Sequence, residues 1–208
     1  MRNNWQCVMS LIGTSVVALG MHTLSINPTV VIGGQSAEAT LRLAQDAASG
    51  PSVYTVQVSD TSIASAPATV SVPAGSTITS FKVTTRPVSV LRTVTVTVAD
   101  ASATLKVRPP VLIKLVASPD TVRRGETVKG SVVIDGPAPN AGSVVKVMVT
   151  SKSGTQPPGV TFPPAVVIPA GQTTVSFIIT VDRSASAGTL TVTAILGNVS
   201  LKQDFTAL

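Results

Sequence analysis

Apolar and polar residues alternate along much of this chain, in short runs that are separated by turn-forming residues. The clearest run is 93–98, where Val94, Val96 and Val98 alternate with threonines. A period of two is typical of a strand with one buried face, whereas an amphipathic helix needs apolar residues three and four positions apart. Because no part of the sequence shows that helical spacing, the pattern predicts an all-β fold.

Eight strands are expected in the first half of the chain. Their predicted ranges are 22–32, 37–43, 53–59, 62–65, 69–72, 77–84, 93–99 and 102–107. The Pro-Ala-Gly sequences at 73–75 and 169–171 predict tight turns, because proline fixes φ and glycine allows a positive φ. Residues 99–102 and 196–198 are expected to turn the last hairpin of each half. Short strands with frequent turns indicate β-sandwiches of the immunoglobulin type.

The second half of the sequence repeats the first. The segment VSVPAGSTITSFKV at 70–83 aligns with VVIPAGQTTVSFII at 166–179, an offset of 96 residues. At the same offset, Leu105 falls opposite Leu201. Because repeated units fold into repeated structures, we expect two tandem immunoglobulin-like β-sandwich domains.

Nearer the start of each unit the offset is shorter. Pro28 aligns with Pro119 at an offset of 91 residues. A five-residue insertion explains the change, and the Pro-, Gly- and Ser-rich stretch 151–164 is where a longer loop is expected. The predicted domains are 21–109 and 110–208.

Composition agrees with this fold and excludes several functions. The chain has 34 valines and 27 threonines among 208 residues, and β-branched side chains suit a pleated sheet. A single cysteine excludes a disulfide framework, and a single histidine argues against a catalytic triad or a His-rich metal site. The nine acidic residues are scattered singly, whereas calcium needs converging oxygen ligands. We therefore expect no enzymatic activity, no metal and no cofactor.

The two Pro-Ala-Gly segments resemble bacterial immunoglobulin-like and fibronectin-III-like repeat domains of secreted and cell-surface proteins. The shared residues are those of 70–83 and 166–179, followed by the closing TVTV at 95–98 and TVTA at 191–194. The resemblance covers roughly 21–208. It implies the sandwich fold, although the cysteines and the tryptophan of antibody domains are absent.

Residues 1–20 have two interpretations. A basic start, an apolar run over 8–20 and the small residues Ala18 and Gly20 before a possible cleavage after Gly20 are the parts of a secretory signal peptide. Alternatively, 8–17 resembles the hairpin sequence at 192–201, and the segment would be the remnant of a preceding repeat. The run is too short to span a membrane, and both interpretations predict an extracellular or cell-surface location.

Basic residues concentrate in the middle of the chain. Nine of the fifteen Lys and Arg residues lie between Lys82 and Lys129. Five of them flank the Pro-Pro pair at 109–110, namely Lys106, Arg108, Lys114, Arg123 and Arg124. They predict an anion-binding seam between the domains, although basic residues on strand edges also serve simply to prevent aggregation. Only Phe81 among the aromatic residues lies nearby, so nucleic acid is not an expected partner.

The inserted loop carries a second candidate contact, Phe162. Loops at the end of a sandwich often carry binding residues, so Phe162 is expected either to be exposed for contact or to pack over the sandwich end. Phe81 and Phe177 occupy equivalent positions and are expected in the cores.

Three hypotheses for function remain. The first is a non-enzymatic spacer or adhesion segment that works with other protein domains of the same polypeptide. The second is a module that binds an anionic surface polymer or glycan through the basic junction. The third is a structural subunit of a filament or phage-like assembly.

Overall fold

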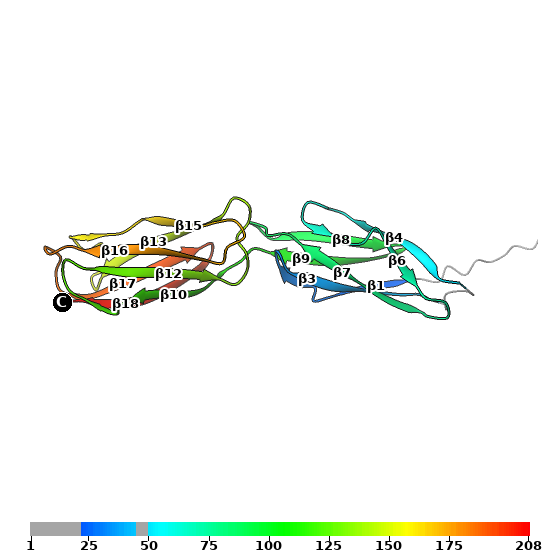
Figure 1. Ribbon diagram of the computed structural model, residues 1–208, viewed down its shortest axis with the longest axis horizontal. Helices are drawn as coiled ribbons and strands as arrows, with labels where there is room; N and C mark the ends of the chain where they lie inside the picture. The colour runs from blue at the N-terminus through cyan, green and yellow to red at the C-terminus, as the bar shows by residue number, and fades with distance from the viewer. Residues whose placement is uncertain (1–21, 45–49) are drawn as a thin grey trace, which may run out of the picture.

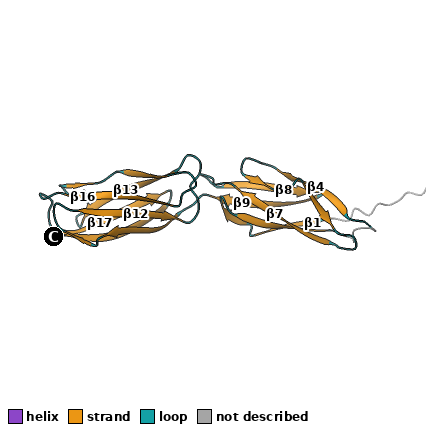
Figure 2. Cartoon of the chain, viewed as in Figure 1, coloured by secondary structure: helices purple, strands orange, loops and turns teal. Residues whose placement is uncertain are grey.

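Every regular element in the described part of the protein is a β-strand (Figure 2). The computed structural model describes residues 22–44 and 50–208, and within them there are eighteen strands and no helix. The strands form four sheets, arranged as two sandwiches that lie end to end along the long axis of the molecule (Figure 1). Strands β1–β9 make up the first sandwich and β10–β18 the second.

The first sandwich packs a four-stranded sheet, ordered β1-β3-β7-β5, against a five-stranded sheet, ordered β2-β9-β8-β4-β6. The strands are β1 (Thr23–Asn27), β2 (Val30–Ile32), β3 (Ser36–Arg42), β4 (Ser52–Val58), β5 (Ala64–Ser65), β6 (Thr69–Val72), β7 (Ile78–Thr85), β8 (Arg92–Val98) and β9 (Ala101–Arg108). Two mainly antiparallel sheets whose strands alternate between the layers make an immunoglobulin-like sandwich.

The second sandwich has the same topology, with sheets ordered β10-β12-β16-β14 and β11-β18-β17-β13-β15. The strands are β10 (Leu112–Ser118), β11 (Thr121–Val122), β12 (Thr127–Ile134), β13 (Ser143–Ser151), β14 (Val160–Thr161), β15 (Ala165–Ile168), β16 (Thr174–Val181), β17 (Gly188–Leu196) and β18 (Val199–Ala207). Each strand of the first sandwich has a counterpart in the second. The duplication seen in the sequence is therefore a duplication of the fold.

Each sandwich has its own hydrophobic core. Along β8, Val94, Val96 and Val98 are fully buried, and the threonines between them face outward. The core residues of the first sandwich come from 26–107 and those of the second from 112–207, with none in common. The period-two alternation in the sequence thus corresponds to the two faces of each strand.

The strand expected over 22–32 is two strands, and that prediction is corrected. β1 pairs antiparallel with β3, whereas β2 pairs parallel with β9 in the opposite sheet. The break falls at Pro28, which has no amide hydrogen to continue the ladder. Pro119 separates β10 from β11 in the same way, so the chain changes sheets at equivalent prolines.

The last hairpin of each sandwich turns at the predicted place. Residues 99–100 connect β8 to β9, and residues 197–198 connect β17 to β18. The hairpins differ in length, because seven residue pairs join β8 to β9 and nine join β17 to β18. The extra pairs lie next to the turn of the second hairpin.

This extension corrects one alignment made from the sequence. Leu105 pairs with Val94, and the corresponding pair in the second sandwich is Phe205 with Leu190. Leu105 and Phe205 are both buried. The counterpart of Leu105 is therefore Phe205 and not Leu201, because two added residues on each strand lengthen the repeat.

The two cores differ where a phenylalanine crosses the neighbouring strand. In the first sandwich Phe81 lies opposite Ala39, and in the second Phe177 lies opposite Gly130. A Cβ atom added at Gly130 would lie 2.3 Å from the ring of Phe177. The ring therefore occupies the space of the missing side chain.

We predict that Gly130→Ala destabilises the second sandwich by about 1–3 kcal/mol, the usual cost of overpacking a core. Phe177→Leu should recover part of this loss when combined with Gly130→Ala, because the shorter side chain frees the space. Denaturant unfolding measures both effects. Gly50→Ala is the control, since no atom lies within 4 Å of its added Cβ. Equal stability of Gly130→Ala and the natural protein would show that the ring is not held in this position.

Candidate functional site

The five basic residues of the predicted seam do not lie together. Lys106, Arg108 and Lys114 flank the linker at residues 109–111, at the end of β9 and the start of β10. Arg123 and Arg124 follow β11 at the opposite end of the second sandwich, close to the last residue of the chain (Figure 1).

Two hydrogen bonds establish this remote position. The backbone nitrogen and Nε of Arg124 both donate to the carbonyl oxygen of Leu208, at 3.3 and 3.2 Å. Leu208 follows β18 at the end of the second sandwich away from the linker (Figure 1). Arg124 is close to the linker in the sequence. In the structure it lies far from the linker, because β10 runs along the length of the sandwich between the two.

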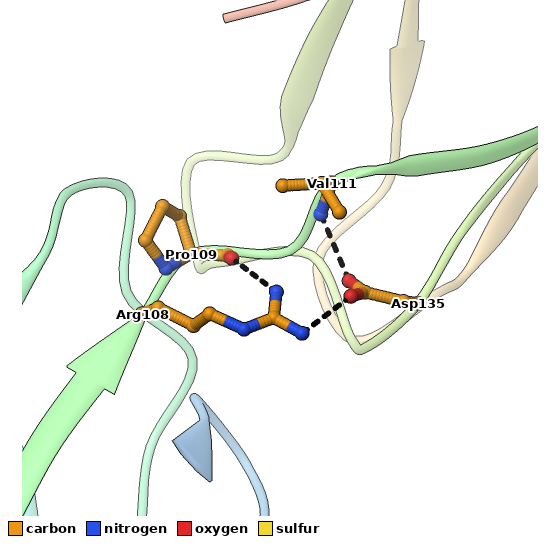
Figure 3. A network of polar contacts seen from close by, with 4 residues as sticks. All are labelled: Arg108, Pro109, Val111 and Asp135. Carbon is orange, nitrogen blue, oxygen red and sulfur yellow. Dashed lines mark hydrogen bonds and ion pairs between the residues drawn. The ribbon is translucent and has the colours of Figure 1, made fainter. Parts of the chain in front are cut away.

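Arg108 is the one predicted residue that is part of the joint between the sandwiches (Figure 3). Its Nη2 lies 2.7 Å from Oδ2 of Asp135, and its Nη1 donates to the carbonyl oxygen of Pro109 at 3.2 Å. The other carboxylate oxygen of Asp135 accepts a hydrogen bond from the backbone nitrogen of Val111 at 2.8 Å. One carboxylate thus connects the last strand of the first sandwich to the linker.

The charge of Arg108 is already compensated by this ion pair. The Asp135 side chain is only 16% exposed and that of Arg108 is 35% exposed, so the pair is partly shielded from water. An incoming anion would have to compete with Asp135. The arrangement therefore suits a structural connection better than an anion site.

Two glycines bring the sandwiches into close contact beside this ion pair. A Cβ atom added at Gly34 would lie 2.6 Å from Cγ of Pro137, and one at Gly136 would lie 2.4 Å from Cγ2 of Ile32. Gly34 and Ile32 belong to the first sandwich, and the other two residues follow β12 of the second. Each side contributes one glycine, and any larger side chain would push the sandwiches apart.

A hollow of about 400 Å³ lies elsewhere along the same linker. The first sandwich contributes Val88 and Ser89, and the second contributes residues before β13 and the tip of the β17–β18 hairpin. The lining residues are Val88, Ser89, Pro109, Pro110, Val111, Pro139, Gly142, Ser143, Val144, Leu196, Gly197, Asn198 and Val199. The linker is therefore closely packed at the glycine contacts and loosely packed at the hollow.

Apart from Arg108 and the linker prolines, the sequence did not single out the residues that make the joint. Asp135 is 27 positions from Arg108 and counted only as one of the scattered acids. Gly34, Gly136 and Pro137 carry ordinary turn signals. The available clue was that Arg108 and Asp135 carry opposite charges and that Arg108 is next to the linker prolines. Pairing the two requires knowing that β12 returns the chain to the linker.

Phe162 packs against the core of the second sandwich and is only partly exposed. It follows β14, which pairs with the end of β16. The expectation of an exposed contact residue is therefore corrected in favour of the alternative, packing over the sandwich end. An exposed phenylalanine ring would leave its apolar surface in contact with water, whereas packing over the sandwich end buries that surface, which is favourable.

A small polar cluster ties the start of β1 to the β8–β9 turn. Nδ1 of His22 and the Asp100 carboxylate form a hydrogen bond, and the His22 backbone nitrogen donates to Oδ2 of Asp100 at 3.4 Å. The His22 ring meets Tyr54 edge-on, with centroids 5.6 Å apart. Desolvation raises the pKa of Asp100, but the hydrogen bond from the His22 side chain, together with hydrogen bonds from the backbone amides of Asp100 and His22, lowers that pKa overall.

Within residues 22–44 and 50–208 there is no group of three or more His, Cys, Asp or Glu side chains that could hold a metal ion. Across the same part of the chain, no helix has the length and apolar character needed to cross a membrane.

No protein-family model and no curated protein sequence matches the chain. Among solved structures it is similar to FdeC, an Escherichia coli adhesin, with a TM-score of 0.41 and 14% identity over 90% of this chain and 63% of that chain. Domains 5–6 of the S-layer protein SbsC match with a TM-score of 0.30 and 18% identity, over 89% and 96% of the two chains. The I9–I11 tandem of titin matches with a TM-score of 0.32 and 12% identity, over 90% and 66%. The chain thus spans less than two thirds of the FdeC chain, and inferences about its function depend on its own geometry.

We predict that Asp135→Ala loosens the joint. It leaves two donors, on Arg108 and Val111, without their acceptor, and such a loss typically costs about 1–3 kcal/mol. Calorimetry should show the two sandwiches unfolding less cooperatively, and Arg108→Ala should add little to the effect of Asp135→Ala. Lys106→Ala is the matched control, because it removes a positive charge beside the linker without breaking an ion pair. Additive effects of Asp135→Ala and Arg108→Ala would contradict the connection described here.

Asp60 provides a test of pH dependence. Its Oδ1 accepts hydrogen bonds from the backbone nitrogen of Ser62 at 2.9 Å and from the Ser62 hydroxyl at 2.5 Å. The bond from the hydroxyl, then the bond from the amide, holds the pKa of Asp60 below its ordinary value. The carboxylate therefore favours the folded state when it is ionised.

Because the pKa is lower in the folded chain, Asp60 stabilises the protein above its unfolded pKa of about 3.9. This contribution is lost as the pH falls through the folded value. Asp60→Asn should therefore be less stable than the natural protein at pH 7, and the difference should close below about pH 4. Denaturant unfolding at several pH values measures it, and a difference independent of pH would rule out this role for the carboxylate.

Proposed function

We propose that this chain is a non-enzymatic spacer or adhesion segment of a secreted or cell-surface protein. The observation that carries the proposal is the joint, which stacks two sandwiches end to end through a linker of three residues, an ion pair and two glycine contacts. The described chain runs from one end of the resulting rod to the other (Figure 1). A segment of this shape keeps the groups attached at its two ends apart.

The outer face of the β8–β9 hairpin supports a role that needs no tightly bound partner. The five-stranded sheet of the first sandwich presents hydroxyl side chains, including Thr93 and Thr104, which are exposed. Charged residues make up only 12% of the chain. Threonine combines strand propensity with a polar hydroxyl, so this hairpin stays hydrated without a ligand, whereas Val144 and Met148 on β13 leave apolar surface exposed.

The edge strands argue against the filament alternative. β6 and β15 have four residues each and form one edge of each five-stranded sheet, and β2 and β11 at the other edges have three and two residues, whereas β10, at an edge of a four-stranded sheet, has seven. Pro67 and Pro73 flank β6, and Pro164 and Pro169 flank β15. Short edge strands next to prolines resist pairing with another copy, which favours a rod that stays separate from its neighbours.

Binding of an anionic polymer is less well supported by the positions of the basic side chains. Lys106 and Lys114 are exposed near the joint, whereas Arg123 and Arg124 are exposed at the far end. A single site built from all five residues would require them to converge. A polymer long enough to contact both groups would need no shaped seam.

The location part of the proposal draws on the sequence. The apolar run over 8–20 and the segments at 70–83 and 166–179 are the features that indicate a secreted or surface protein. Residues 1–20 lie outside the described part of the structure.

We predict an extended and salt-independent shape. Small-angle X-ray scattering should give a maximum dimension of roughly 80 Å, since strands of up to nine residues at about 3.4 Å each, with their loops, span about 40 Å per sandwich. The maximum dimension should be the same in about 50 and about 500 mM salt, although interactions between surface charges are screened much more strongly at the higher concentration. A compact particle, or one whose length varies with salt, would contradict the spacer role.

A second measurement separates the functions. On intact source cells, an antibody to the second sandwich should bind without permeabilisation, and purified chain should pass an anionic-polymer column at low salt. If the column retains the chain and the double variant Arg123→Glu with Arg124→Glu abolishes retention, the chain binds an anionic polymer at the end of the second sandwich away from the joint. Labelling only after permeabilisation would overturn the surface location.

A further inference from the structure

The two sandwiches differ in one respect that concerns the joint. The β17–β18 hairpin has nine residue pairs and the β8–β9 hairpin has seven. The two added pairs are Ile195 with Ser200 and Leu196 with Val199. They extend the hairpin by about 7 Å, at roughly 3.4 Å per residue.

The extension ends at the joint. Its tip, residues 196–199, lines the hollow together with the linker prolines and with Val88 and Ser89 of the first sandwich. In the first sandwich the corresponding turn, Ala99–Asp100, lies at the opposite end, away from the linker (Figure 1). Of the two hairpins, the longer one therefore has its tip at the joint between the two described sandwiches.

The other contacts of the joint leave no room to move closer. At the Gly34–Pro137 and Gly136–Ile32 contacts, not even a methyl group could be added without overlap. None of these four residues lines the hollow. Bending that compresses these contacts is blocked sterically, whereas bending that closes the hollow displaces only solvent.

We propose that the joint bends in one direction, toward the hollow, with the glycine contacts as the pivot and the tip of the β17–β18 hairpin as the stop. Closing the hollow brings residues 196–199 against Val88 and Ser89, and the motion ends there. The Arg108–Asp135 ion pair lies beside the pivot and stays intact during the motion. This mechanical property belongs to the joint itself and does not depend on where the protein acts.

Pairs of spin labels can measure the direction of bending by double electron–electron resonance. In a Cys7→Ser background, the first pair of labelled cysteines replaces Arg92 on β8 and Lys146 on β13. These two strands belong to different sandwiches, which face each other across the hollow. The other replaces Glu38 and Lys129, on β3 and β12, the strands next to the glycine contacts. All four side chains are exposed. We expect a broad distance distribution with a tail to short distances for the first pair, and a narrow one for the second.

Two variants test the stop. Removing residues 195, 196, 199 and 200 should extend the short-distance tail of the Arg92–Lys146 pair by several ångströms, because the hollow can then close further. Ser89→Trp should remove the tail, because an indole ring fills the hollow, and Ser89 is exposed enough to accept it without disturbing the core. Asn198→Ala is the control for the tip, since it changes the chemistry of the turn but not its length.

Equal widths for the two label pairs, or an unchanged tail in Ser89→Trp, would overturn the proposal. If the shortened hairpin does not fold, the Ser89→Trp comparison decides alone. A rod that scatters as an extended particle but bends equally in all directions would refute this inference and leave the spacer function standing.

Discussion

A linker of three residues, Pro109 to Val111, places two independently packed sandwiches in direct contact, and the Asp135 carboxylate holds that linker in place. One oxygen neutralises Arg108 at the end of the first sandwich, and the other accepts the backbone hydrogen of Val111. With two prolines restricting φ, few conformations remain to this segment. Because each core is complete without the other, the relative placement of the two sandwiches depends on the linker and on the contacts beside it.

The linker alone would not produce the observed stacking. Proline pairs stiffen a chain, but two sandwiches on a short stiff linker still rotate unless their ends fit. The fit comes from Gly34 and Gly136, each of which lies against a side chain of the opposite sandwich. The joint thus combines a covalent restriction, an ion pair and close steric contact, while the hollow beside the β17–β18 hairpin leaves one side less constrained.

Much of the fold could be predicted from the sequence, because strand identity depends on local alternation and on turn residues. Pro73 to Gly75 marked the turn before β7, where Gly75 has a positive φ, and the buried valines of β8 followed the period of two. The split at Pro28 and the longer second hairpin were missed. Both depend on which strands pair across the sheets, and an alternating sequence is compatible with more than one pairing.

The joint was less predictable than the fold. Arg108 was identified from the sequence, but as a candidate anion-binding residue. Its partner Asp135 becomes a neighbour only because β12 returns the chain to the linker. Arg123 and Arg124 are close to the linker in sequence but separated from it by the length of β10. Charge concentration along a chain therefore did not correspond to charge concentration in space, because each strand carries the chain from one end of a sandwich to the other.

The central claim, that the joint holds the two sandwiches as one extended body, is tested most directly by residual dipolar couplings of the backbone amides in weakly aligned solution. Couplings fitted separately for β1–β9 and β10–β18 should give alignment tensors with the same principal axis and similar magnitudes, because bending toward the hollow is limited by the tip of the β17–β18 hairpin. Asp135→Ala should separate the two tensors. Tensors that already differ strongly in the natural protein would mean that the sandwiches reorient independently, and would contradict this claim.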